Sequence, residues 1–377
     1  MAATSTLAAG KGAPLARLLS RLAGMLGGVL ATGHAEATDL PEDRADVMYH
    51  AYTGGGVTAT GPAVLVRKNI ADTFSLSASY YVDAVSNASI DVVTTASRYH
   101  EERIEKAGGL DYVYEDALIS LAASNSHEPD YNADSASLDV AQDFFGGMTT
   151  LNLGYTRGWD TVGKHNDPSF SQKADHWQYR LGATQILTPR WYVSANLEAI
   201  ADTGFLASPY RAARVFGAAV PERDPSTRAS RAVALRAVGS LDADSAVRAE
   251  YRYFWDTWDI RANTVELGYS RYVQQRRWLL DGYLRYYRQN HASFYSNNFT
   301  TEMTYMSRNR QLSSFHSLGV GVKATYTALR VPAKYEIKLN GALERLRFQY
   351  NDFTDIRTGQ AYGFDANVLE LFVSATF

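Results

Sequence analysis

The sequence lacks cysteine altogether and has no large excess of either charge. Without cysteine, the chain is excluded from having disulfide bonds, thiolate metal sites, covalently attached c-type haem or a lipidated N-terminal cysteine. Its 37 basic and 40 acidic residues nearly balance, so nucleic-acid binding has no electrostatic support. No apolar run reaches the ~20 residues that a membrane-spanning helix needs.

The first 37 residues are typical of a cleaved secretory leader. Basic residues precede a short apolar core at residues 22–31, and residues 35–37 fit the small-x-small cleavage pattern. A membrane anchor is the alternative, but about ten apolar residues are too few to cross a bilayer. Cleavage after Ala37 leaves residues 38–377 with a net charge of −5.

Apolar and polar residues alternate along many stretches of the chain. The clearest example sets Ala249, Tyr251, Tyr253 and Trp255 against Arg248, Glu250, Arg252 and Asp256. A period of two is that of a strand, and a soluble sheet cannot easily bury the charged face. The pattern therefore predicts strands that present one face to lipid and the other to a polar interior.

The run over residues 369–377 shows the same pattern. Leu369, Leu371, Val373, Ala375 and Phe377 fall on one face, and Phe372 alone breaks the polar alternation of the other. A strand ending on an aromatic residue resembles the closing strand of bacterial outer-membrane barrels, and such a resemblance implies that the barrel-assembly machinery recognises Phe377. An ordinary amphipathic edge strand is the alternative.

Short and long connections alternate between the predicted strands. Residues 145–147, 188–190, 241–245 and 274–277 form short links, whereas residues 158–176, 202–228, 291–311 and 351–364 form long ones. This asymmetry is typical of outer-membrane barrels, whose short turns are periplasmic. We expect an all-β, antiparallel up-and-down transmembrane barrel of about sixteen strands, with fourteen or eighteen as alternatives. It would form a single domain over residues 38–377, with both termini in the periplasm of a Gram-negative bacterium.

Two further patterns refine this prediction. Trp191 and Trp278 begin predicted strands on the periplasmic side, and Trp177, Trp255 and Trp258 stand at the outer ends of strands, which is the arrangement of two aromatic girdles. Aromatic residues in the core of a soluble β-sandwich are the alternative. Over residues 334–350 the apolar positions change phase, which predicts a β-bulge near Glu344 or Arg345.

Charged residues on the predicted inner face are candidates for lining the lumen: Arg180, Glu198, Arg236, Glu250, Arg252, Asp256, Glu266, Asp281, Arg285, Lys334, Glu336 and Lys338. They form either a polar channel or ion pairs between neighbouring strands that fill the barrel, and the second reading is favoured for most of them. Because both signs are mixed, no strong ion selectivity is expected.

Residues 84–100 are too rich in β-branched side chains for an ordinary loop. We expect this segment to fold into the barrel and constrict it, with Asp91, Thr94, Thr95, Arg98, Glu101 and Glu102 as candidate constriction residues.

Histidines offer the raw ingredients of a hydrolase or metal site, without a decisive spacing. His291 lies near Ser293, and His316 precedes Ser317, but no third group marks either pair as catalytic. Histidines and carboxylates at residues 127–130 and 160–167 fall in predicted outer loops, where solvation is the favoured reading over a metal site. We therefore predict no metal site and no cofactor held by the chain itself.

Several blocks resemble a family of uncharacterised bacterial outer-membrane proteins, domain of unknown function thirty-five-seventy. They are GPAVLVRK (61–68), SASYYVD (77–83), SIDVVTTA (89–96), GFL (204–206), PYR (209–211), EYRYF (250–254) and DIRANT (259–264). The resemblance implies a barrel fold and an outer-membrane location, but no catalytic residues. It also implies proximity to a flavin-attaching transferase, a thioredoxin-like protein and a small lipoprotein.

The leading hypothesis is a non-enzymatic outer-membrane barrel that acts as a pore or as a housing for a small partner. The first alternative is a scaffold for an electron-transfer complex, whose redox centres would belong to a lipoprotein or flavoprotein partner because the chain has no cysteine. The second alternative is an outer-membrane hydrolase that uses His291 or His316. Lipid of the outer membrane is an expected partner in every case.

Overall fold

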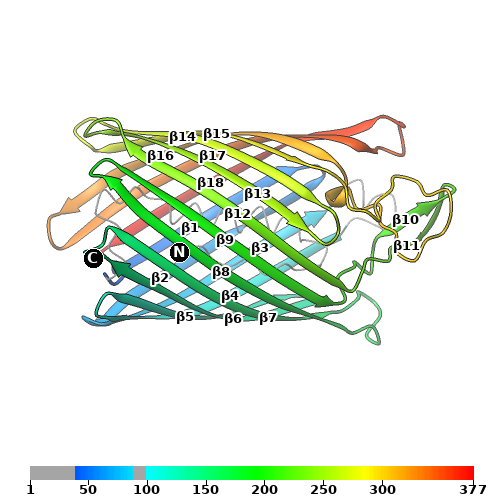
Figure 1. The fold of residues 1–377 in the computed structure, drawn as a ribbon, viewed down its shortest axis with the longest axis horizontal. Coiled ribbons are helices and arrows are strands. Elements are labelled where there is room, and N and C mark those ends of the chain that lie inside the picture. Colours follow the sequence, from blue (N-terminus) through cyan, green and yellow to red (C-terminus); the bar gives the residue numbers. More distant parts are fainter. Residues whose placement is uncertain (1–38, 88–98) are drawn as a thin grey trace.

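The computed structural model describes residues 39–87 and 99–377, except for the side chains of Asn87, Tyr99 and His100. They form a closed antiparallel barrel (Figure 1) in the order β1-β18-β17-β16-β15-β14-β13-β12-β9-β8-β7-β6-β5-β4-β3-β2. The sixteen barrel strands are β1 (Arg44–Gly54), β2 (Val57–Ala71), β3 (Phe74–Asn87), β4 (Tyr99–Tyr114), β5 (Ala117–Glu128), β6 (Tyr131–Phe144), β7 (Thr149–Val162), β8 (Gln172–Thr188), β9 (Trp191–Gly204), β12 (Thr227–Ser240), β13 (Ser245–Asp256), β14 (Arg261–Val273), β15 (Trp278–Gln289), β16 (Phe315–Val331), β17 (Tyr335–Thr354) and β18 (Ala361–Thr376). The predicted fold and strand number are confirmed.

Strand alternation builds an apolar outer belt around the barrel. In β18, Leu371 is 52% exposed and Val373 is 44% exposed, whereas the alternate residues Glu370 and Phe372 are 4% and 6% exposed. Strands of 11 to 20 residues are long enough to cross a bilayer, for which a tilted strand needs roughly 9 to 11. Within the described residues, no helix is long and apolar enough to span a membrane.

The two ends of the barrel differ, and we name them by their connections. At the turn end, adjacent strands are joined by short turns such as residues 145–148 and 274–277. The longer connections lie at the opposite end, the loop end, where the hairpin of β10 (Ala212–Val215) and β11 (Ala218–Pro221) extends beyond the barrel (Figure 1). Residues 290–314, which connect β15 to β16 and contain the 3₁₀ helix η1 (Arg310–Leu312), are called the cap segment below.

The first and last barrel strands close the barrel. Arg44 of β1 lies opposite Thr376 of β18, and the pairing continues without a shift to Gly54 and Ala366. The backbone N–H of Phe377 donates to the carbonyl of Asp43 at 3.1 Å, and the Phe377 ring is 51% exposed beside the Lys68 ammonium. The pairing makes β18 the closing strand of the barrel, as the resemblance of residues 369–377 to such a strand predicts.

The prediction that residues 84–100 fold inward is wrong at both ends of that segment. β3 continues to Asn87 and β4 begins at Tyr99, and the two strands pair up to those residues. Ladder hydrogen bonds join backbone groups, so pairing continues past the apolar belt whatever the side chains are. Glu101 and Glu102 belong to β4. Four other constriction candidates lie outside the described residues: Asp91, Thr94, Thr95 and Arg98.

The predicted bulge near Glu344 is also wrong, because β17 pairs with both neighbours without a register shift at that position. Leu346, Phe348 and Tyr350 therefore remain on the inner face, where the apolar pattern continues inside the barrel. The register of β16 and β17 shifts instead between Thr327 and Leu329, near the turn end.

The tryptophan prediction needs one correction. Trp191 is 40% exposed, and Trp177, Trp255 and Trp278 are partly exposed, as expected for interfacial residues. Trp258 is only 5% exposed, because the cap segment packs over it. It contributes to the core of the loop end and not to a girdle.

Candidate functional site

Ion pairs on the inner face connect strands that are not direct neighbours. Arg248 of β13 donates to Asp281 of β15, with Nη2 and Oδ1 separated by 2.9 Å. Arg285 of β15 donates to Glu266 at 2.9 Å and lies 3.6 Å from Glu344 of β17. The five charged groups form one network over β13 to β17. Each charge has a partner of opposite sign, which offsets the cost of removing it from bulk water.

Small inward residues make room for these pairs. The Arg180 guanidinium of β8 donates to Asp139 of β6 at 2.6 Å, and Gly154 of β7 lies between them in register. A Cβ atom on Gly154 would stand 2.3 Å from an Asp139 carboxylate oxygen. Gly268 has the same relation to Arg248, whose Cζ would lie 2.4 Å from its Cβ. A glycine beneath each pair thus lets a side chain cross over the intervening strand.

The remaining lumen candidates lie in varied surroundings. Arg252 donates to Glu198 at 3.1 Å across β12, and Lys338 lies 2.6 Å from Glu336 near the turn end. Arg236 is exposed and lies opposite Glu250 in register.

Two candidates lie away from the central network. Asp256 is buried at the loop end, where it accepts hydrogen bonds from Arg228 and from the backbone N–H of Trp258. Lys334 lies in the exposed turn between β16 and β17.

Two buried histidines lie in the inner wall at positions that the sequence did not predict. His176 of β8 bridges two carboxylates, with Nδ1 at 2.8 Å from Asp202 and Nε2 at 2.7 Å from Asp160. His50 of β1 lies 2.7 Å from Asp83 and stacks on Tyr81. The alternation of β7 could have placed Asp160 in a strand, but its histidine partner is known only from the register with β8. The His176 contacts join β8 to its neighbours β7 and β9, whereas the His50 contact joins β1 to β3 across β2.

The loop end is filled by an aromatic cluster between the cap segment and the inner faces of the last strands. Phe294, Tyr295 and Leu312 of the cap pack with the buried residues Tyr350 and Phe353 of β17. Backbone hydrogen bonds fix the cap internally, for example from Ala292 to the carbonyl of Leu312 at 2.8 Å.

Arginines of the cap secure it to β17 and β18. The Arg308 guanidinium lies 4.4 Å from the centre of the Phe353 ring and donates to the carbonyl of Thr354 at 2.7 Å. Arg310 lies 5.2 Å from the Phe364 ring, near Gly55 in the turn between β1 and β2. The cap is therefore docked on the inner rim by apolar, cation–π and hydrogen-bond contacts.

An acidic pair outside the strands contacts the same cap. The Glu222 carboxylate accepts from the backbone N–H of Arg308 at 2.7 Å. Burial, reinforced by the Glu222 charge, raises the pKa of Asp224 above the ordinary carboxyl value, although Arg211 and Arg228 act in the opposite direction. The Ser307 side chain of the cap also hydrogen-bonds to Asp224, so the protonation of Asp224 is linked to the position of the cap.

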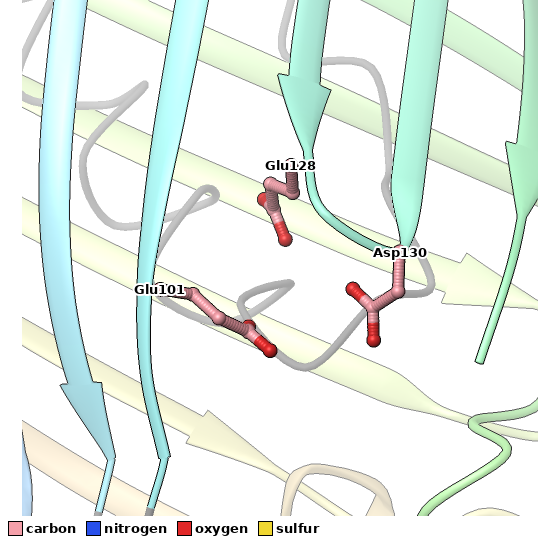
Figure 2. Close-up of side chains that lie close together, drawn as sticks. All are labelled: Glu101, Glu128 and Asp130. Carbon is pink, nitrogen blue, oxygen red and sulfur yellow. The ribbon is translucent and has the colours of Figure 1, made fainter. Parts of the chain in front are cut away.

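Three carboxylates meet at the loop end between β4 and β6 (Figure 2). Oxygen atoms of Glu101, Glu128 and Asp130 lie within 4.8 Å of one another. Tyr210, from the connection between β9 and β10, donates to Asp130. Of the residues that the structure describes, these form the group whose donors suit a hard cation such as Ca²⁺, which prefers carboxylate oxygens.

The two histidines considered for a hydrolase lie at the loop end. His291 Nδ1 is 2.9 Å from the carbonyl oxygen of Ala292, and His316 Nε2 is 2.8 Å from the Gln349 side-chain oxygen. Neither contact is the serine–histidine pair that nucleophilic catalysis requires.

Residues 164–343 match the model of a family described as "Protein of unknown function (DUF3570)". The predicted resemblance to this family is confirmed. The matched region runs from the loop before β8 into β17, so it contains the cap segment and the charged network of β13 to β15, whereas Glu344 lies one residue beyond its end. No curated protein matches the sequence.

Solved outer-membrane proteins resemble the chain in fold. A bacterial polysaccharide outer membrane secretin aligns with a TM-score of 0.52 and 8% identity, over 89% of this chain and 99% of that one. The siderophore receptor PirA from Acinetobacter baumannii gives 0.44 and 11%, over 86% of this chain and 57% of the receptor. OpdK from Pseudomonas aeruginosa, solved with vanillate, gives 0.46 and 11%, over 89% and 98%. The chain spans little more than half of the PirA receptor's length. The secretin alignment supports the barrel fold of Gram-negative outer-membrane proteins.

Proposed function

We propose that this protein is an outer-membrane transport barrel for small polar solutes, and that the cap segment gates its extracellular end. The loop end would face the cell exterior and the turn end the periplasm, because long loops are extracellular in such barrels. The observation that carries the proposal is the contrast between the two parts of the interior. The strands present a polar, charge-paired wall, whereas the loop end is filled by a separate segment.

The nature of the cap supports gating. Barrel strands cannot move apart without breaking ladder hydrogen bonds, but the cap is a connection whose contacts with β17 are made largely by side chains. Displacing it would break an apolar cluster and the hydrogen bonds that join the cap to β17, to Trp258 and to residues 214–223, while leaving the barrel ladder intact. Long loops that fold over a rigid scaffold are common carriers of this kind of function.

The charge pattern of the wall sets the expected selectivity. Arg180, Arg248 and Arg285 each pair with a carboxylate, so neither sign dominates. We expect a solute to be admitted by size and polarity, with weak discrimination between cations and anions.

Conductance across a planar bilayer tests the proposal. The wild-type barrel should show low or intermittent conductance, and replacing residues 292–312 by a short glycine-serine linker should raise it severalfold. In a salt gradient, the reversal potential of the shortened barrel should lie near zero. If the shortened barrel folds and inserts but conducts no better than the wild type, the cap does not gate a pore.

A matched pair of substitutions separates gating from general damage. Phe294 is 6% exposed within the cap, whereas Phe216 is 76% exposed at the tip of the β10–β11 hairpin. Phe294→Ala should increase the open fraction, and Phe216→Ala should leave it unchanged. Equal effects of the two variants would contradict the assignment of the gate to the cap.

A further inference from the structure

A pocket of about 400 Å³ opens among the connections at the loop end. Its walls come from three places: the approach to β12, the connection between β13 and β14, and the cap segment. Trp258 and Phe294 are almost fully buried in its wall, while Met303 and Tyr305 are half exposed. Its volume lies within the range of roughly 300 to 1,000 Å³ that small-molecule sites occupy.

The pocket is held in shape by contacts that leave its lining uncharged. The Trp258 indole N–H donates to the carbonyl of Thr227 at 2.9 Å, and the rings of Trp258 and Phe294 meet edge to face with centroids 5.0 Å apart. Arg228 lies against the Trp258 ring but is bound to Asp256. These contacts connect β12, the β13–β14 connection and the cap into one wall.

The lining combines hydroxyl groups with apolar surface. Thr227, Thr257, Ser293, Thr304 and Tyr305 carry hydroxyls, whereas Trp258, Phe294 and Met303 supply aromatic and thioether surface. A hydroxyl can both donate and accept, so such a lining matches a ligand that carries hydroxyls of its own.

This combination discriminates among ligand classes. A charged ligand would meet no countercharge in the lining and would lose hydration without compensation. A hydrocarbon would desolvate the hydroxyls without replacing their hydrogen bonds to water. A neutral sugar satisfies both kinds of surface, since a pyranose has apolar C–H faces and a rim of hydroxyls.

We propose that this pocket is an extracellular binding site for a neutral pyranose sugar, with Tyr305 and Met303 contacting the sugar ring and Thr304 bonding its hydroxyls. The inference goes beyond the transport proposal, because the site lies in the outer connections and exists whether or not the lumen conducts.

Saturation-transfer NMR on the purified barrel tests the site, in a detergent without a sugar headgroup. The probes are the methyl glycosides of glucose, galactose and mannose, and maltose. Phenol and glucose 6-phosphate serve as the apolar and the charged comparison. At least one neutral sugar should bind, and it should bind more tightly than either comparison compound.

Two substitutions locate the binding. Tyr305 is 45% exposed, so Tyr305→Ala should leave the fold intact and weaken the sugar by roughly threefold to tenfold through the loss of ring contact. Thr304→Val should weaken it through the loss of a hydroxyl. Phe216→Ala and Thr300→Val are the matched controls outside the pocket, and both should bind as the wild type does.

The outcomes are distinct from those of the conductance test. Absence of binding by all four sugars overturns the site, as does sugar binding that neither Tyr305→Ala nor Thr304→Val weakens. Tighter binding of phenol would replace the sugar assignment with an apolar aromatic ligand. If cap removal raises the conductance but the intact barrel binds no sugar, only the transport proposal is supported.

Discussion

Phe353 offers a quantitative test of how the cap is held. Its side chain is fully buried near the loop end of β17, between Tyr350 and Tyr362 on the strand side and Arg308 on the cap side. Replacing a buried phenylalanine by alanine costs about 3 to 5 kcal/mol. Assigning roughly half of this cost to the cap side, where Arg308 lies against the ring, gives an expected weakening of cap docking by roughly 1.5 to 2.5 kcal/mol.

Hydrogen exchange of the cap amides measures this loss. The N–H groups of Ala292, Ser296 and Ser307 are bonded within the cap, so they exchange when the cap opens. In Phe353→Ala, their exchange should accelerate about 10-fold to 70-fold, while the amides of β5 to β7 keep their wild-type rates.

Phe145→Ala is the control, because that ring is 77% exposed in a turn at the opposite end. Cap exchange within about threefold of the wild type in Phe353→Ala would refute the reasoning, since it would mean that the cap does not depend on the aromatic cluster. Equal acceleration in β5 to β7 would show that the barrel as a whole had been loosened.

Two more predictions concern the inner wall and the acidic pair. Gly154→Ala places a Cβ atom against the Asp139–Arg180 pair, so it should lower the temperature at which the folded band disappears in heat-modifiability gels. Gly341→Ala, whose Cβ would meet only Leu371 at an ordinary 3.5 Å, should not, and equal effects would contradict the role of Gly154. Because the folded-state pKa of Asp224 is raised, its contribution to cap stability should be complete below about pH 4 and decline as the pH rises through that raised pKa. Asp224→Asn should therefore slow cap exchange at pH 9 but have little effect at about pH 4, and a pH-independent difference would argue against this linkage.

Much of the barrel could be predicted from residue alternation, because lipid and a polar interior impose opposite demands on successive side chains. The closing strand with Leu371 outside and Glu370 inside is the clearest case. Strand ends were less predictable, since backbone pairing extends β3 and β4 beyond the belt where alternation is enforced. The apolar residues Leu346 and Phe348 made the alternation of β17 look as if it changed phase. They lie on the inner face, where they pack in clusters at the loop end and not against lipid.

The candidate sites depended on contacts that sequence alone does not give. Glu101 and Glu128 are brought together by the pairing of β4 and β5, and His176 meets Asp160 through the pairing of β7 and β8. The pocket needs Trp258 and Tyr305, which are separated by the whole of β14 and β15. These residues come together because of the strand register and the path of the cap segment. Neither can be recognised in the sequence around the individual residues.

The pairing of β1 with β18 has a consequence for biogenesis. These strands hydrogen-bond from Arg44 and Thr376 onward. The first strand can therefore pair with its second neighbour only after nearly the entire chain has been made. A chain that stopped before β18 would leave the edges of β1 and β17 open, and unpaired backbone groups are costly in lipid. A chain truncated before β18 is therefore not expected to form a smaller closed barrel. We expect the complete barrel to be stable in the membrane and truncated chains to be degraded by proteases.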